Sequence, residues 1–332
     1  MAVTLRDVAK SLGVSTSTIS RTLNGQGRIS PATRQLIKER MQEMNYTPNL
    51  NAQRLVSGRA YMVALDFGAN SHLLDDTYFA ELTSGIQNAL EEFGYNLLLN
   101  ATGDRLLHLV RSQAVDGVML FAGELEDIDK LKGLAAEGIP SVLIGHCYVP
   151  TSPDFVAVFT DLSHGARQVA DYLFEQGHRH IGFIGSYETD DVLDAFRERL
   201  RELGAPLKND LVSFAGPDPE QAEKQMSALL ALPEPPTAVF ARTDALAAGA
   251  LRAAYRAGVR VPHEVSVVGH DDVSLARRIT PALTTVWIDC AEMGKMATEA
   301  MRMMLDCPGV AMRPRVIRPE LVVRETVAAP VR

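Results

Sequence analysis

The sequence lacks the features that mark membrane-spanning, secreted and disulfide-stabilised proteins. No apolar stretch approaches the run of about 18 residues that a membrane helix needs. The N-terminal stretch MAVTLRDVAK carries charges where a signal peptide needs an apolar core, so we expect a cytoplasmic protein without a membrane partner. Cysteine is scarce: Cys147, Cys290 and Cys307 are scattered and lack metal-ligand spacing, so we expect reduced, buried thiols.

Signatures of the common enzyme classes are also missing. The chain contains no G-x-S-x-G elbow, no Walker loop, no G-x-G-x-x-G fingerprint and no H-E-x-x-H pair. His178 and His180 flank Arg179 where a loop enters a strand, and this spacing gives poor geometry for one metal ion. We therefore expect no catalytic residues, no metal and no cofactor.

What the chain does have is a basic head on an acidic body. Over all 332 residues the formal net charge is −8. Residues 1–59 nevertheless hold nine Lys and Arg against three acidic residues, an excess of six positive charges, which leaves −14 for the rest. A polyanionic partner such as nucleic acid therefore suits the head alone.

Capping residues divide this head into three predicted helices. Thr4 and Asp7 form a pair like a capping box. Gly13 ends the first helix, Ser15 caps the second and Ser30 caps the third. The helices are predicted over Leu5–Ser11, from Ser15 to about Leu23, and over Ala32–Met44. Their expected core consists of Leu5, Val8, Ala9, Val14, Ile19 and Leu23, with an apolar stripe of Leu36, Ile37, Met41 and Met44.

The second helix is unusual for its short hydroxyl side chains, in the stretch VSTSTISRTLN. Serine and threonine are mediocre helix formers because their hydroxyls compete for the backbone. In a helix-turn-helix, however, the second helix enters the major groove, and short hydroxyls let it approach the bases closely. Arg21 on the same helix can pair with a guanine edge or clamp a phosphate. The alternative is an ordinary surface helix rich in serine and threonine.

From Tyr61 onward, short apolar runs alternate with longer amphipathic stretches. About ten strands are expected, beginning with Met62–Phe67 and ending with roughly Arg315–Val323. Such alternation predicts parallel sheets with helices on both faces, and this many strands predicts two sheets. The segment after Asn100 leaves room for only one brief helix. Ligands of such folds bind beyond the carboxyl ends of the strands, often between two lobes.

The head closely resembles the lactose-repressor/galactose-repressor (LacI–GalR) family of transcriptional regulators, through VTLRDVAKSLGVSTSTISRTLNG and then ISPATRQLIKERMQEMNYTPNLNAQRLVSGR. This similarity covers the first 59 residues almost without a gap. It continues more loosely through YFAELTSGIQNALEEFGYNLLL, LFEQGHRHIGFIG, TAVFARTDALAAGAL and VSVVGHDD, and so spans nearly the whole chain.

The resemblance implies an all-α helix-turn-helix DNA-binding head and an α/β body like the periplasmic binding proteins, built from two Rossmann-like lobes. The DNA-binding domain would span residues 1–47, and a hinge helix or linker would span residues 48–59. The effector-binding and dimerisation domain would span residues 60–332, with an N-lobe of about 60–160 and 289–325 and a C-lobe of about 161–288.

The resemblance also implies a regulator, expected to be a repressor, that binds a palindromic DNA operator as a homodimer. A small-molecule effector, a sugar or related polar metabolite, would bind between the lobes and control operator affinity. The chain ends at Arg332 without a heptad-bearing tail, which favours a dimer over a tetramer. A secreted solute-binding protein and an α/β enzyme are the alternatives. The basic head and the missing signal peptide oppose the first, and the missing catalytic motifs oppose the second.

Several residues of the head and hinge match DNA contacts of the family. Those at base-reading positions are Thr16, Ser17 and Arg21, and those at phosphate contacts are Thr18, Asn24 and Asn49. Leu55 matches a hinge leucine that enters the minor groove and kinks the operator. Ala52 occupies the small-residue position beside it.

Fewer positions match the effector contacts of the family. Asp271, the first acid of GHDD, matches an aspartate that accepts hydrogen bonds from sugar hydroxyls. Tyr78 and Phe79 resemble an aromatic pair at the cleft entrance. Trp287, the only tryptophan, falls near the cleft lining, where it could stack on a ligand or simply belong to the core.

The expected cleft also departs from the family pattern. Thr243 stands before Asp244 where the family usually has asparagine, and Gly145 stands where an acid is common. Val192 replaces an arginine that clamps the ligand, and Asp191 lies just before it, either in the cleft or at a solvated helix start. Loss of the arginine and gain of an acid would disfavour an anionic ligand at this position.

Overall fold

A computed structural model describes residues 3–23, 29–46, 54, 57–67, 77–100, 105–122, 125–145, 155–188, 191–310 and 312–331. Contacts between residues divide the chain into two compact units, Met1–Ala60 and Tyr61–Arg332. The first unit carries the basic head. Every strand among the described residues belongs to the second unit. No helix in the described ranges combines the length and the apolarity needed to cross a membrane.

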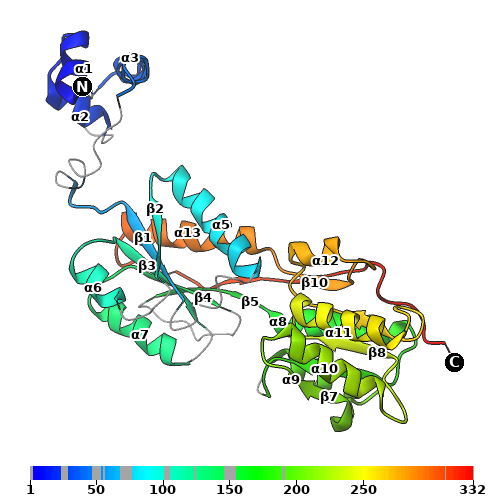
Figure 1. The fold of residues 1–332 in the computed structure, drawn as a ribbon. Helices are drawn as coiled ribbons and strands as arrows, with labels where there is room; N and C mark the ends of the chain where they lie inside the picture. The colour runs from blue at the N-terminus through cyan, green and yellow to red at the C-terminus, as the bar shows by residue number, and fades with distance from the viewer. Residues whose placement is uncertain are drawn as a thin grey trace. The chain divides into compact units, whose positions relative to one another are not determined.

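The head consists of α1 (Leu5–Leu12), α2 (Thr16–Leu23) and α3 (Pro31–Glu43) (Figure 1). At the start of α1, the Thr4 backbone N–H donates to an Asp7 carboxylate oxygen at 2.9 Å, and the Asp7 N–H donates to the Thr4 hydroxyl. Gly13 ends this helix in the left-handed region, at φ +65°. The Ser30 hydroxyl caps α3 by accepting from the Thr33 N–H. The predicted caps are therefore confirmed.

One small apolar cluster holds these three helices together. Its buried members are Val8, Ala9, Ile19, Ile37 and Met41. The predicted stripe on α3 is wrong at Leu36, whose side chain is 52% exposed. Ile37 and Met41 are four residues apart and share the buried face, whereas Leu36 is turned about 100° away from Ile37.

Six parallel strands form the first sheet of the second unit. Their order is β11 (Arg315–Ile317), β5 (Val156–Thr160), β4 (Ser141–Gly145), β3 (Gly117–Ala122), β1 (Met62–Asp66) and β2 (Asn96–Asn100). On one face lie α5 (Thr77–Glu92) and α13 (Cys290–Asp306), and on the other lie α6 (Leu106–Arg111) and α7 (Leu125–Ala136) (Figure 1). The brief α6 confirms the short segment expected after Asn100.

Four parallel strands form the second sheet, in the order β7 (Val212–Phe214), β6 (Ile181–Gly185), β8 (Ala238–Ala241) and β9 (Ser266–Val268). One face packs against α8 (Leu162–Glu175) and α9 (Asp191–Glu202), and the other against α10 (Pro219–Leu230) and α11 (Asp244–Ala257). Two parallel sheets with helices on both faces are thus confirmed. The sequence did not indicate β7, which has only three half-buried residues.

A short antiparallel pair, β10 (Thr285–Trp287) with β12 (Glu320–Val322), links the two sheets. One strand was predicted over roughly Arg315–Val323, but the structure divides it. The first part, β11, pairs with β5, and the second part pairs with β10. Beyond β12 the chain bonds to the second sheet, since the Val267 N–H donates to the Thr326 carbonyl at 2.9 Å. Residues 320–328 therefore accompany the second sheet, although the sequence suggested that the N-lobe continued to 325.

His178 fastens this C-terminal segment to the second sheet. Its imidazole is buried, with Nδ1 2.9 Å from the Thr237 hydroxyl and Nε2 3.0 Å from the Ala328 carbonyl oxygen. A carbonyl only accepts, so Nε2 carries the hydrogen. Burial lowers the pKa of His178 below its ordinary value, the Ala328 bond opposes this, and the Arg179 charge adds to it.

We predict that the second unit loses stability as the pH falls through the ordinary histidine pKa of about 6.5. Because the folded pKa of His178 is the lower one, the unfolded chain binds the extra proton first. Each unit of difference between the unfolded and folded pKa lowers the free energy of unfolding by about 1.4 kcal/mol once the pH is below both values. Urea unfolding followed by Trp287 fluorescence measures the effect. His178→Gln, which can still donate to Ala328 but cannot titrate, should flatten the profile. Parallel profiles for the two chains would contradict the prediction.

Candidate functional site

The N-terminus of α2 is organised by a cluster of hydroxyl groups. The Ser15 hydroxyl accepts from the Thr18 backbone N–H at 3.1 Å. It also lies 2.7 Å from the Ser17 hydroxyl and 2.8 Å from the Thr18 hydroxyl. The Thr18 N–H also donates to the Ser15 carbonyl at 3.0 Å, so Ser15 holds the first turn through two acceptors. The hydroxyl contacts fix side chains that would otherwise rotate.

Three of the predicted base-reading residues share the solvent face of α2. Thr16, Ser17 and Arg21 are exposed, whereas Ile19 and Thr22 are buried against the other helices. At about 100° per residue, the three exposed residues span about 140° of the helix circumference. Thr18, predicted to contact phosphate, is half-buried at the edge of this face. The face presents hydroxyl groups beside a guanidinium, a set that can bond to base edges and phosphates.

The remaining predicted DNA contacts cannot be placed. They lie outside the described residues, and they are Asn24, Asn49, Ala52 and Leu55.

A second polar site lies at the carboxyl ends of β8 and β9. Asp271 follows β9 with φ +107°, a left-handed value that is rare outside glycine. Its N–H donates to the Val286 carbonyl at 2.8 Å, and one carboxylate oxygen lies 2.9 Å from Nδ1 of His270. The side chain of Asp271 is 13% exposed. The backbone of β10 thus holds the predicted effector aspartate in an uncommon conformation at the edge of the sheet.

Two more carboxylates adjoin Asp271, and each has partners. Asp244 is fully buried and accepts from the Thr285 hydroxyl at 2.5 Å and from the Val273 N–H at 2.9 Å. Burial raises the pKa of Asp244 well above its ordinary value, and the nearby Asp271 charge raises it further. Asp272 pairs with the Arg324 guanidinium at 2.6 Å.

Thr243 reaches the same region from β8. Its hydroxyl caps α11 by accepting from the Leu246 N–H at 3.2 Å, and its side chain is half-buried. The next residue, Asp244, donates its N–H to the His270 carbonyl at 2.8 Å, which joins the two loops. The loops that carry Thr243 and Asp271 are therefore joined by a hydrogen bond between the residues next to them.

The backbone of Trp287 pairs with that of Asp271 in an isolated β-bridge. Its side chain is 37% exposed, while its neighbours Val286 and Ile288 are buried, so the alternation of β10 directs it outward. The interpretation of Trp287 as core is wrong. It borders a surface pocket of about 280 Å³ with Glu81, Ser84, Gly85 and Asn88 of α5 and residues 288–291.

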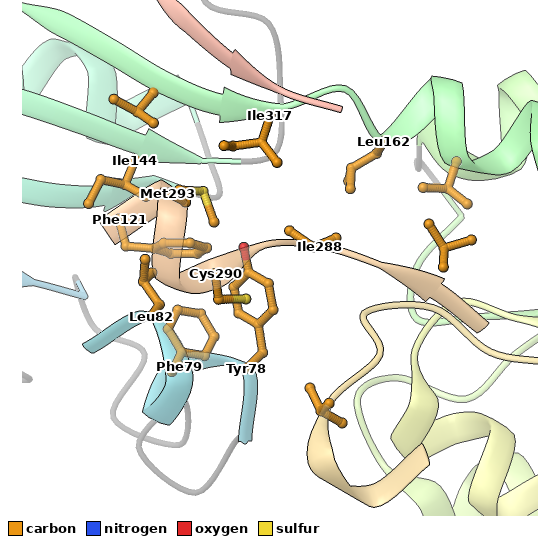
Figure 2. Packing of buried hydrophobic residues seen from close by; sticks show 14 of the residues in the cluster. Tyr78, Phe79, Leu82, Phe121, Ile144, Leu162, Ile288, Cys290, Met293 and Ile317 are labelled. Carbon is orange, nitrogen blue, oxygen red and sulfur yellow. The ribbon is translucent and has the colours of Figure 1, made fainter. Parts of the chain in front are cut away.

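Tyr78 and Phe79 do not form an open entrance. They are 3% and 5% exposed and pack in an apolar cluster with Leu82, Phe121 and Cys290, as Figure 2 shows. The rings of Phe79 and Phe121 meet edge to face, with centroids 4.5 Å apart. The predicted entrance position is wrong because α5 turns both rings toward the first sheet.

Asp191 begins α9 and lies on the surface between α8 and α9. It shares an open pocket with Ser163, Arg167, Asp194, Ala195 and Glu198. This position agrees with a solvated helix start favoured by the helix dipole. The next residue, Val192, is fully buried, and Gly145 is buried within the first sheet. Neither supplies a charged group to a ligand.

Sequence reasoning missed the partners that surround these acids. His270 contacts Asp271, and Arg324 forms an ion pair with Asp272. The sequence signal for His270 was its place beside the acid in GHDD. It also missed Asp66, which is fully buried at the end of β1 and pairs with Lys130 of α7. In the described part of the chain, no cluster of three metal-ligating side chains occurs.

Comparisons with known proteins agree for both units. Residues 4–49 match the family described as "Bacterial regulatory proteins, lacI family", and residues 170–327 match a "Periplasmic binding protein-like domain". Among curated proteins, the HTH-type transcriptional regulator DegA of Bacillus subtilis (strain 168) is 32% identical over 98% of each chain.

Two solved structures share the architecture. A transcriptional regulator CelR–cellobiose complex is 30% identical, with a TM-score of 0.72 over 98% of this chain and 99% of that one. A lac repressor dimer bound to operator and the anti-inducer ONPF is 22% identical, with a TM-score of 0.80 over 99% of this chain and 100% of that one. The predicted fold, a helical DNA-binding head with an α/β body, is confirmed.

The hydroxyl cluster generates a prediction about the stability of α2. Ser15→Ala removes the hydroxyl acceptor of the Thr18 N–H and keeps its carbonyl acceptor. It should cost about 1 kcal/mol, or about a fivefold faster hydrogen exchange of the first α2 amides. Ser17→Ala is the matched control, because in the described structure its hydroxyl accepts from no backbone N–H. Equal exchange rates in the two variants would show that Ser15 does not act as a cap.

Proposed function

Since the chain belongs to the lacI family of bacterial regulatory proteins, it is a DNA-binding transcriptional regulator, and we propose that it acts as an effector-controlled repressor. In this proposal residues 1–47 read the operator, residues 48–59 link the units, and residues 60–332 sense the effector and dimerise. The protein would work in the cytoplasm, where its DNA lies, and would catalyse no reaction.

One observation supports operator reading most directly: the solvent face of α2. Thr16, Ser17 and Arg21 are exposed together on the second helix of the helix-turn-helix. None of the three contributes to the apolar cluster that holds the head together. Their side chains are therefore available to reach base edges in the major groove.

We also propose a homodimer on a palindromic operator, because two-fold protein symmetry matches two-fold DNA. The second unit offers an apolar edge for pairing. β2 is the terminal strand of the first sheet, Leu97 and Leu98 are half-exposed, and Leu99 is 46% exposed. A partner that covers this edge would satisfy its strand and remove its leucines from water.

The proposed effector is a neutral, hydroxyl-bearing metabolite held by Asp271. A carboxylate accepts hydroxyl hydrogens, and the neighbouring Thr243 can add a further polar contact. An anionic effector is disfavoured, because the Asp271 carboxylate would repel it and the buried Val192 stands where the resemblance implies a cation.

Arg21→Ala tests operator reading. We expect a loss of about 1–3 kcal/mol in binding to an operator selected from random duplexes, together with relaxed base preference at one position of each half-site. Arg40→Ala is the matched control, since Arg40 lies on α3 and pairs with Glu43. Anisotropy titrations measure affinity, and sedimentation measures the stoichiometry of the complex. Unchanged selection by the Arg21 variant would remove this residue from the proposed reading surface.

Asp271→Asn tests the effector site in a thermal-shift screen of sugars, polyols and nucleosides. A ligand at about 100 times its Kd stabilises the protein by about 2.7 kcal/mol. Loss of a charged hydrogen bond should weaken binding by about 10–100-fold, which at the same ligand concentration reduces this stabilisation to about 0.4–1.4 kcal/mol. Asp191→Asn, at the exposed start of α9, should keep the shift. A full shift in the Asp271 variant would place the effector elsewhere.

A further inference from the structure

The imidazole of His270 occupies a closed position beside Asp271. It is fully buried, and the Phe240 ring lies 6.3 Å away between centroids. On another side α8 approaches through Gly165, where an added Cβ would lie 2.8 Å from Val286 and 3.4 Å from Nε2 of His270. The missing side chain at Gly165 makes room for this packing. The ring therefore has little freedom to rotate away from Asp271.

The 2.9 Å contact between Nδ1 of His270 and Oδ1 of Asp271 has a definite polarity when Asp271 is ionised. An ionised carboxylate can only accept, so Nδ1 carries the hydrogen. A donor to the charged form stabilises that form. His270 thus favours the carboxylate over the carboxylic acid.

This support matters because three carboxylates meet here. Asp244 takes hydrogen bonds from Thr285 and Val273, and Asp272 takes an ion pair from Arg324. The Asp271 charge repels both carboxylates. Burial is the main cause of the raised pKa of Asp244, and the Asp271 charge is the second cause. Arg324 bonds to Asp272, and His270 donates to the Asp271 carboxylate.

We propose that His270 is the positioning residue of the effector site: it holds the Asp271 carboxylate in one orientation and in its charged form, ready to accept the hydroxyl hydrogens of a neutral sugar or polyol. This inference rests on the proposed effector role of Asp271. It adds that the first residue of HDD acts through the acid and does not itself touch the effector.

Two substitutions separate positioning from packing. His270→Phe keeps a ring of similar size but removes the donor. His270→Asn loses the ring, yet its side-chain amide nitrogen takes the place of Nδ1. A packing role predicts that the phenylalanine variant works and the asparagine variant fails. A positioning role predicts that the asparagine variant keeps the function of the site and the phenylalanine variant loses it. Circular dichroism measures the melting temperature of each variant separately.

The first readout needs no effector. In the full chain labelled with ¹³C at aspartate carboxyl carbons, Asp271→Asn identifies the Asp271 signal and a pH titration gives its pKa. His270→Phe should raise that pKa by about one unit, because the charged form loses a donor, and His270→Asn should restore it. Asp244, Asp272 and Arg324 also lie at this site, and they are the same in every variant. An unchanged pKa in the phenylalanine variant would overturn the proposal.

The second readout is calorimetric binding of cellobiose and of ribose as probes. If either sugar binds, His270→Phe should weaken it about tenfold or more, and His270→Asn should stay within about threefold of the original. Equal weakening in both variants would also overturn the proposal. Sugar binding that survives Asp271→Asn would instead refute the effector role of Asp271. If the Asp271 pKa still rises in His270→Phe and returns in His270→Asn, the contact between His270 and Asp271 is supported all the same.

Discussion

The antiparallel pair β10–β12 is the constraint on which the second unit depends. Three residues on each strand pair where the chain passes between the two sheets, and α13 of the first sheet begins three residues after β10. β10 also hydrogen-bonds to the loop after β9, because the Asp271 N–H donates to the Val286 carbonyl. A displacement of β10 would thus alter the acid at the second sheet and the helix on the first sheet together. That coupling is what a sensing domain of two lobes requires.

The acids beyond β8 and β9 gain their chemistry from this arrangement. A buried carboxylate is costly unless it is paired or protonated. Asp272 is paired with Arg324, Asp244 is held by two donors and has a raised pKa, and Asp271 is left at the rim with His270 beside it. One charged acceptor at the edge of an otherwise compensated cluster suits a neutral, hydroxylated ligand. In the basic head, by contrast, the hydroxyls and the guanidinium on the solvent face of α2 are not buried.

Sequence reasoning succeeded where local chemistry decides structure. Caps such as Thr4 and Ser30 act within three residues, so the helix starts of the head could be read directly. The apolar runs predicted both parallel sheets. It failed where distant packing decides. The sequence cannot say whether Tyr78 faces a cleft or a core, since that depends on how α5 lies on the first sheet. His270 was overlooked because its role depends on the left-handed backbone of Asp271 and on the space left by Gly165 of α8.

In the proposed regulator, one chain couples an effector site to an operator-reading helix. The most direct measurement is the linkage between the two ligands in the full-length protein. Operator affinity is measured by anisotropy with and without the metabolite selected by thermal shift, and metabolite affinity is measured by calorimetry with and without operator. Coupling of about 1–3 kcal/mol, or about 5–150-fold, is expected and must be the same factor in both directions. Operator and metabolite affinities that do not depend on each other would show that the two sites are uncoupled.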